Sequence, residues 1–163
     1  MSYPDPRYRR TRGELSAVYR TVDTGSQLTV RLKTEVHYLA TGASTNGEFG
    51  LYRWDMAGPP AGPSPHFHRT FSESFYVLSG TVRLFDGQRW IDAVAGDFMF
   101  VPHGGIHAFR HESGEPASML ILFTPGAPRE GYFEALAEIA ASGRRPSQDE
   151  WNDLYRRHDT HMV

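Results

Sequence analysis

Residues 65–80 read PHFHRTFSESFYVLSG and combine two histidines and a glutamate with a run of aromatic and aliphatic residues. His66 and His68 are separated by one residue, so on a strand both imidazoles point to the same face. Glu73 follows His68 at an odd offset, and an unbroken strand would send its carboxylate to the other face. Glu73 therefore joins the histidines only if residues 69–72 turn and the chain re-enters on a new strand.

A second stretch, GDFMFVPHGGIHAFRH at residues 96–111, supplies a third histidine, His107, after a turn rich in Pro and Gly. By the same alternation His107, Phe109 and His111 share one face of the strand that follows. Three imidazoles and one carboxylate suit a divalent transition metal, and they leave positions open for substrate or water. The candidate ligands are His66, His68, Glu73 and His107. The metal can be iron, manganese, nickel, copper, cobalt or zinc.

Short strand-like runs separated by turn residues fill the chain from Val18 to Phe123. The runs cover residues 28–32, 36–40, 50–56, 74–80, 81–86, 88–94, 97–102, 106–111 and 117–123. Asp86-Gly87 between two alternating runs is a strong hairpin signal. The spacing predicts an all-β barrel or sandwich over residues 18–124.

The pattern becomes helical in residues 125–163. Phe133, Leu136 and Ala137 form one stripe of a helix that ends at Gly143, and Ser147 with Glu150 has the spacing of a capping box for a second. Residues 1–17 are polar and contain two prolines, which predicts an N-terminal arm, either flexible or exchanged between subunits.

The composition narrows the classes of function. The chain has 163 residues, 39% hydrophobic content, a net charge of −2 and no cysteine. Disulfides, thiolate metal sites and cysteine nucleophiles are excluded. The charge gives no electrostatic reason to expect nucleic acid or a membrane as partner. No apolar run has the length of a membrane span and no segment resembles an export signal, so we expect a cytoplasmic protein.

The two stretches resemble the two sequence motifs of the cupin superfamily, in particular small single-domain microbial cupins of the quercetinase-like type. The first motif has His-x-His, three or four residues, Glu, six residues and Gly, and its counterparts here are His66, His68, Glu73 and Gly80. The second has Gly, five residues, Pro-x-Gly, two residues and His, and its counterparts here are Gly96, Pro102, Gly104 and His107. The resemblance implies a jelly-roll barrel, the double-stranded β-helix, with the two short helices appended.

Two positions depart from these motifs. The glycine that opens the first motif is Pro60 here, and the asparagine that closes the second is His111. Every ligand position is nonetheless filled. An imidazole at residue 111 can hydrogen-bond beside the metal, or titrate near neutral pH as asparagine cannot.

The resemblance implies an enzyme with one bound metal, a small-molecule substrate and a homodimeric assembly. The candidate catalytic residues are Glu73 and His111. Dioxygenase chemistry on a phenolic or enolisable substrate is the first hypothesis, in which Glu73 accepts the substrate proton. A redox-neutral cyclase or isomerase is the second hypothesis, in which Glu73 or His111 moves the proton, and a non-catalytic binding protein is the third. Alternation from the ligands predicts that Phe75 and Phe109 line the substrate pocket.

Overall fold

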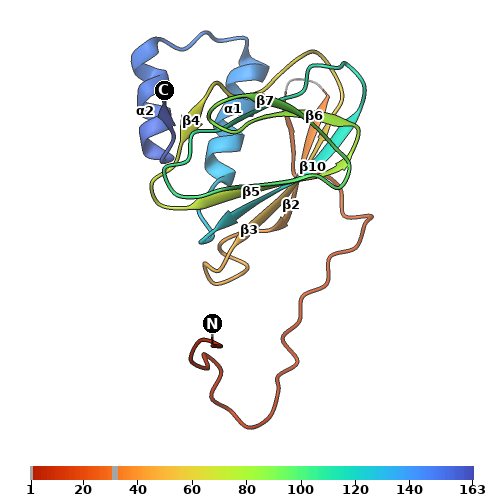
Figure 1. Ribbon diagram of the computed structural model, residues 1–163, viewed down its shortest axis with the longest axis vertical. Coiled ribbons are helices and arrows are strands. Elements are labelled where there is room, and N and C mark those ends of the chain that lie inside the picture. The colour runs from red at the N-terminus through yellow and green to blue at the C-terminus, as the bar shows by residue number, and fades with distance from the viewer. Residues whose placement is uncertain (1, 31–32) are drawn as a thin grey trace.

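The computed structural model describes residues 2–30 and 33–163 and consists mainly of antiparallel sheets (Figure 1). The largest sheet has the strand order β1 (Leu28–Val30), β2 (Thr34–Ala40), β3 (Gly50–Met56), β10 (Ala117–Thr124), β5 (Ser72–Ser79) and β8 (Phe98–Val101). Strand β10 comes last in the chain among these six strands but lies between β3 and β5. It therefore joins β1, β2 and β3 to β5 and β8. Residues 31 and 32 of the first predicted strand lie outside the described residues.

Two smaller sheets complete the barrel. One has the order β7 (Trp90–Val94), β6 (Thr81–Phe85) and β9 (Ala108–Arg110), and the other pairs β4 (His66–Phe67) with β11 (His161–Met162). The chain passes from β5 in the large sheet to β6 in this smaller sheet through a bend at Gly80, whose φ is +69°. A Cβ there would lie 2.4 Å from the carbonyl oxygen of Pro116, so only glycine fits. The antiparallel sheets confirm the predicted jelly-roll barrel.

The core is built from the inward face of alternating strands. Along β3 and β10 every second residue is buried, which is the pattern of a sheet with one face in the core. Tyr52 on β3 has edge-to-face contacts with Phe123 on β10 and Phe133 on the first helix, at centroid distances of 5.6 and 5.4 Å. Each buried ring stabilises the fold by about 1.5–3 kcal/mol through removal of apolar surface from water, and these contacts join the helix to the barrel.

The two predicted helices are present at one end of the barrel (Figure 1). Helix α1 (Glu130–Ser142) ends at Gly143, which has the left-handed φ of +65°. Helix α2 (Gln148–Arg157) begins at Ser147, and Ser147 and Glu150 form the expected reciprocal capping box. In the described part of the chain no helix is long and apolar enough to cross a membrane.

The chain before β1 departs from the predicted boundary of the barrel. Residues 2–27 contain no helix or strand and run away from the barrel (Figure 1), so the sheet begins at Leu28 and not near Val18. Polar and turn-forming residues at 23–26 interrupt the apolar pattern there, and Thr24 donates a backbone hydrogen bond to Thr21. Exchange of this arm between subunits stays a prediction.

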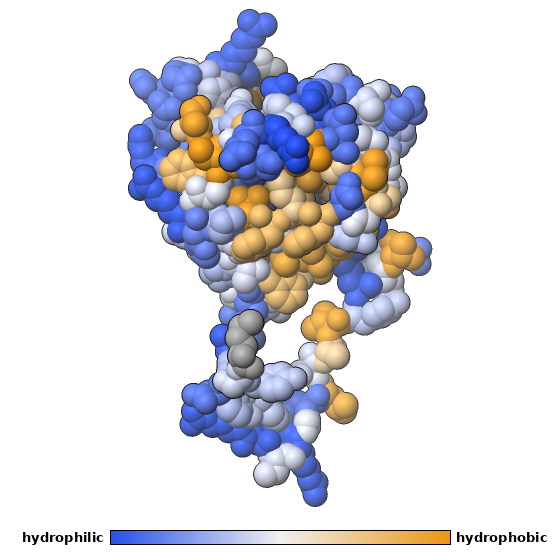
Figure 2. Space-filling view, viewed as in Figure 1, coloured by the Kyte–Doolittle hydropathy of each residue, from blue (hydrophilic) through white to orange (hydrophobic). Residues whose placement is uncertain are grey.

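Apolar side chains gather on part of the surface shown in Figure 2. The exposed large hydrophobic residues include Tyr76 and Leu78 on β5 and Phe98 and Phe100 on the neighbouring edge strand β8. The homodimer that the family resemblance implies stays a prediction.

Candidate metal centre

Four residues that the sequence singles out meet inside the barrel. His66 lies on β4, His68 directly follows it, Glu73 lies on β5, and His107 directly precedes β9. The chain leaves β4 at residue 68 and re-enters at Ser72, which is the break that brings the carboxylate to the histidines. His66 and His107 also exchange backbone hydrogen bonds of 3.0 and 2.9 Å. All four are buried, and their candidate ligand atoms lie within 4.8 Å of one another.

In each of the three histidines, the same ring nitrogen, Nδ1, is hydrogen-bonded to a backbone carbonyl. Nδ1 of His66 donates to the carbonyl of Ser64 at 2.8 Å, and Nδ1 of His107 donates to Gly105 at 3.0 Å. Nδ1 of His68 donates to the carbonyl of Asp159 at 2.5 Å. Because Nδ1 carries the proton in each bond, Nε2 is left with its lone pair for a metal. The three histidines are therefore oriented as ligands.

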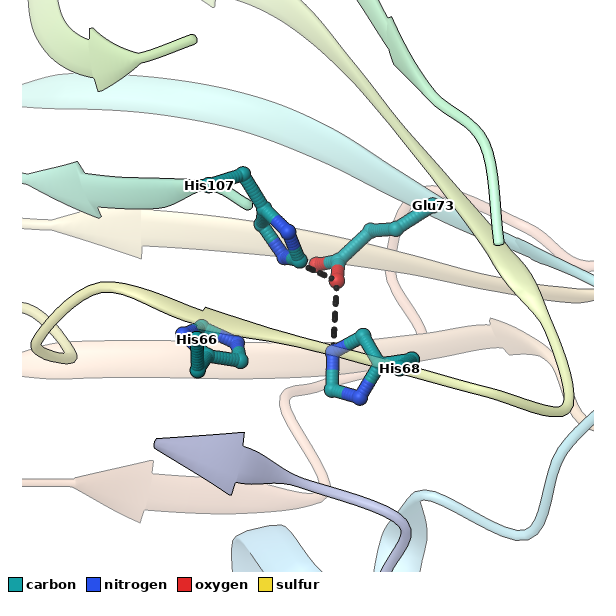
Figure 3. Close-up of side chains that lie close together, drawn as sticks. All are labelled: His66, His68, Glu73 and His107. Carbon is teal, nitrogen blue, oxygen red and sulfur yellow. Dashed lines mark hydrogen bonds and ion pairs between the residues drawn. The ribbon is translucent and has the colours of Figure 1, made fainter. Parts of the chain in front are cut away.

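Glu73 sits between two of these histidines (Figure 3). Its Oε2 lies 2.9 Å from Nε2 of His107 and 3.2 Å from Nε2 of His68. Burial opposes ionisation of the carboxyl, but the hydrogen bond from His107 and the neighbouring imidazoles of His107 and His68 outweigh it and hold the pKa of Glu73 below its usual range. Burial likewise opposes the protonation of His107, and the Glu73 carboxylate outweighs it, so the pKa of His107 is raised. In the metal-free protein each of these two groups therefore favours the charged form of the other.

The donor set fits a metal, and one buried atom favours its presence. Nε2 of His68 is near Oε2 of Glu73 but is not aligned for a hydrogen bond, so it is a buried polar atom without a partner. A buried nitrogen without a partner costs about 1–3 kcal/mol, and coordination would satisfy it. Three nitrogens and one oxygen suit the divalent transition metals predicted above.

His66 makes the stability of the metal-free protein dependent on pH. Burial, and then the charge of His107, lower its pKa from 6.5 to about 3. In the unfolded chain His66 takes up a proton as the pH falls through about 6.5, whereas in the fold it stays neutral. The unfolded state then binds more protons, so the free energy of unfolding falls, by at most about 1.4 kcal/mol per pH unit from this residue.

Urea unfolding of chelator-treated protein at pH 7 and pH 5 measures this loss. We expect the loss to shrink in His66→Gln and to persist in His103→Gln, since His103 is exposed. An equal loss in both variants would contradict the assignment to His66.

The C-terminal segment holds the loop that carries His68. The carbonyl of Asp159 accepts the hydrogen bond from Nδ1 of His68. Its carboxylate oxygen Oδ2 accepts three more, from the backbone N–H of Arg69 at 2.9 Å, the backbone N–H of Thr70 at 2.7 Å and the Thr70 hydroxyl at 2.7 Å. Strand β11 then pairs with β4 beside His66. The sequence interpretation missed Asp159, because nothing local relates it to the ligands.

A cavity of about 540 Å³ opens beside the four residues, and His66 and Glu73 are part of its wall. Its apolar lining comes from the barrel and from both helices, which therefore cover the barrel mouth. The lining includes Trp54, Phe109, Ile121, Phe133, Leu136, Trp151 and Tyr155. The volume and the apolar walls are typical of a small-molecule site.

The other candidate site residues lie around this cavity. Phe109 lines it, as the alternation predicts, whereas Phe75 is fully buried behind the wall, with its ring 5.9 Å from those of His107 and Phe109. His111 also lines the cavity and is not part of the four-residue cluster. Its Nε2 donates to the carbonyl of Glu115 at 2.6 Å, which leaves Nδ1 as an acceptor.

Arg129 is a further cavity residue that the sequence interpretation missed. It is the N-cap of α1 and is 4% exposed. The sequence did contain a signal for Arg129. A cation at the N-terminus of a predicted helix interacts unfavourably with the helix dipole, which indicates that the residue has another role there.

Comparison with known proteins agrees with the motifs and the fold. A family model described as Cupin domain matches residues 54–123. An uncharacterized protein of Streptomyces coelicolor is 32% identical over 88 residues, which are 54% of this chain and 79% of that protein.

Solved structures show the same fold. An RmlC-like cupin from Shewanella frigidimarina has a TM-score of 0.57 at 19% identity, over 70% of this chain and 94% of its own. A predicted oxalate decarboxylase from Thermotoga maritima has a TM-score of 0.55 at 19% identity, over 67% of this chain and 99% of its own. With the motifs, the antiparallel barrel and these likenesses, the chain belongs to the cupin superfamily.

Proposed function

We propose that this protein is a metal-dependent enzyme that converts a small, flat organic molecule held in the cavity. One observation carries the proposal: the four candidate ligands converge at the wall of the cavity, and two of them, His66 and Glu73, face into it. A substrate in the cavity therefore lies against the metal centre. Aromatic walls on barrel and helices suit a planar ring and exclude water from the reacting atoms.

Dioxygenase chemistry on a phenolic or enolisable substrate is the reaction we favour. A bound transition metal would supply Lewis acidity and, where redox-active, electrons for dioxygen. Glu73 is ionised at neutral pH and can accept the proton of a substrate hydroxyl at Oε2. Phe109 and Trp54, which contact each other at a centroid distance of 5.8 Å, provide a wall for the substrate ring.

A redox-neutral isomerase or cyclase is the second candidate, and two residues of the cavity wall, Glu73 and His111, favour it. Glu73 can remove a proton, and His111 presents a free Nδ1 that can receive or return one. Both steps proceed without dioxygen. A non-catalytic binding protein would use the same cavity without turnover.

Elemental analysis of freshly purified protein, followed by oxygen-electrode assays, separates these candidates. We expect about one transition metal per chain, and oxygen uptake with a panel of flavonols and other enolisable phenols. Zinc and turnover without oxygen uptake would favour the isomerase or cyclase. No bound metal after reconstitution with each candidate ion would contradict the proposed function.

A further inference from the structure

Arg129 is part of the cavity wall, and its guanidinium is enclosed by aromatic rings. Its Cζ lies 4.4 Å from the ring centroid of Tyr132 and 5.3–5.7 Å from those of Phe71, Phe123 and Phe133. A cation over aromatic faces gains about 0.5–2 kcal/mol per contact. The rings therefore hold the guanidinium in one place without neutralising it.

The hydrogen-bond donors of Arg129 are only partly used. Nη1 donates to the carbonyl of His158 at 2.6 Å, which ties α1 to the C-terminal segment. Nε is buried and has no partner, and within residues 2–30 and 33–163 Arg129 forms no ion pair. Burial lowers the pKa of the guanidinium, yet arginine remains protonated at neutral pH. A buried cation without a counter-ion is costly unless a ligand supplies one.

The charge of the cavity wall also favours an anion. Among the described residues that line the cavity, Glu73 is the one carboxylate, and Arg129 and Arg144 are cations. Arg144 is exposed and already pairs with Glu150, whereas Arg129 is unpaired. A divalent metal held by Glu73 and three neutral histidines would make the interior more positive still.

We propose that Arg129 binds an anionic group of the substrate, and that the substrate class is a flat aromatic acid. The inference rests on the proposed function insofar as the cavity is the substrate site. The aromatic walls of the cavity contact the substrate ring, and the guanidinium of Arg129 binds a carboxylate or a similar anionic group of the substrate. Arg129 thus orients the substrate against the metal centre.

Matched binding of 2-naphthoate and 2-naphthamide tests the inference. The two probes share ring and shape and differ in charge, and titration calorimetry at neutral pH on chelator-treated protein removes the metal as a competing anion site. We expect the wild-type protein to bind 2-naphthoate at least about 10-fold more tightly than 2-naphthamide. The ratio should fall to near one in Arg129→Gln, lie between these two values in Arg129→Lys, and be unchanged in Arg156→Gln, because Arg156 is exposed and is not part of the cavity wall.

Each outcome of the binding measurements either supports or overturns the role of Arg129. Equal affinities in the wild-type protein, or no binding of either probe at millimolar concentration, would overturn the inference, and neither result needs a variant that folds. A preference that survives in folded Arg129→Gln would place the anion elsewhere and also overturn it. A preference lost in Arg129→Gln and reduced in Arg129→Lys supports it. Because these measurements use metal-free protein, failure of the metal-dependent function would be seen separately, in the elemental analysis.

Discussion

Replacing His66 by alanine is expected to lower the affinity of the protein for divalent transition metals by about 100-fold or more. Loss of a hydrogen-bonded partner behind a ligand already costs 10–100-fold, and this variant removes the ligand itself. His66 is 5% exposed and its Nδ1 is fixed by Ser64, so the variant leaves a gap in a buried and oriented set of ligands. Elemental analysis after dialysis against a mild chelator measures the retained metal.

His103→Ala is the matched control for this variant. His103 is exposed in the turn before His107, so the same substitution there should leave the metal content unchanged. Far-UV circular dichroism should show that both variants retain the barrel. If His66→Ala keeps one metal per chain under the conditions in which His103→Ala does, the assignment of His66 as a ligand is wrong.

Replacing Asp159 by glycine is expected to weaken both the fold and the metal centre. The change removes the carboxylate that accepts three hydrogen bonds from Arg69 and Thr70. Glycine is unstrained at the left-handed φ of 47° found at residue 159, so the result reports the lost bonds and not a forced backbone. We expect the free energy of unfolding to fall by about 1–3 kcal/mol, and the metal affinity to fall about 10–100-fold.

Two other variants make this experiment specific. Asp159→Asn keeps an acceptor oxygen and tolerates the positive φ, so its losses should be smaller than those of Asp159→Gly. Asp153→Ala removes an exposed carboxylate that pairs with Arg156 on the same helix, and should change stability by less than about 0.5 kcal/mol. Urea unfolding and metal titration of the three variants give both quantities. Unchanged metal affinity in Asp159→Gly would show that His68 is held without the C-terminal segment.

The ligands and the helices could be predicted because their signals are local. His66 and His68 share a face by strand alternation, and the turn after them brings Glu73 back within a few residues. Ser147 and Glu150 form a capping box because three residues separate them. In each case the geometry follows from bonds between neighbours in the chain. His107 comes from the second stretch, residues 96–111, and the motif resemblance groups it with the other three ligands.

Asp159 and Arg129 could be placed only by the tertiary structure. Asp159 lies 91 residues from His68 in the chain, and its contacts form only when the C-terminal segment returns across the barrel. Arg129 becomes a buried cation only when the start of α1 brings its guanidinium over the rings of Phe71 and Phe123. The chain by itself therefore determined which atoms can bind a metal. Long-range packing decided what orients them, what covers the cavity and which charge faces the substrate, because those contacts depend on segments that meet only in the folded barrel.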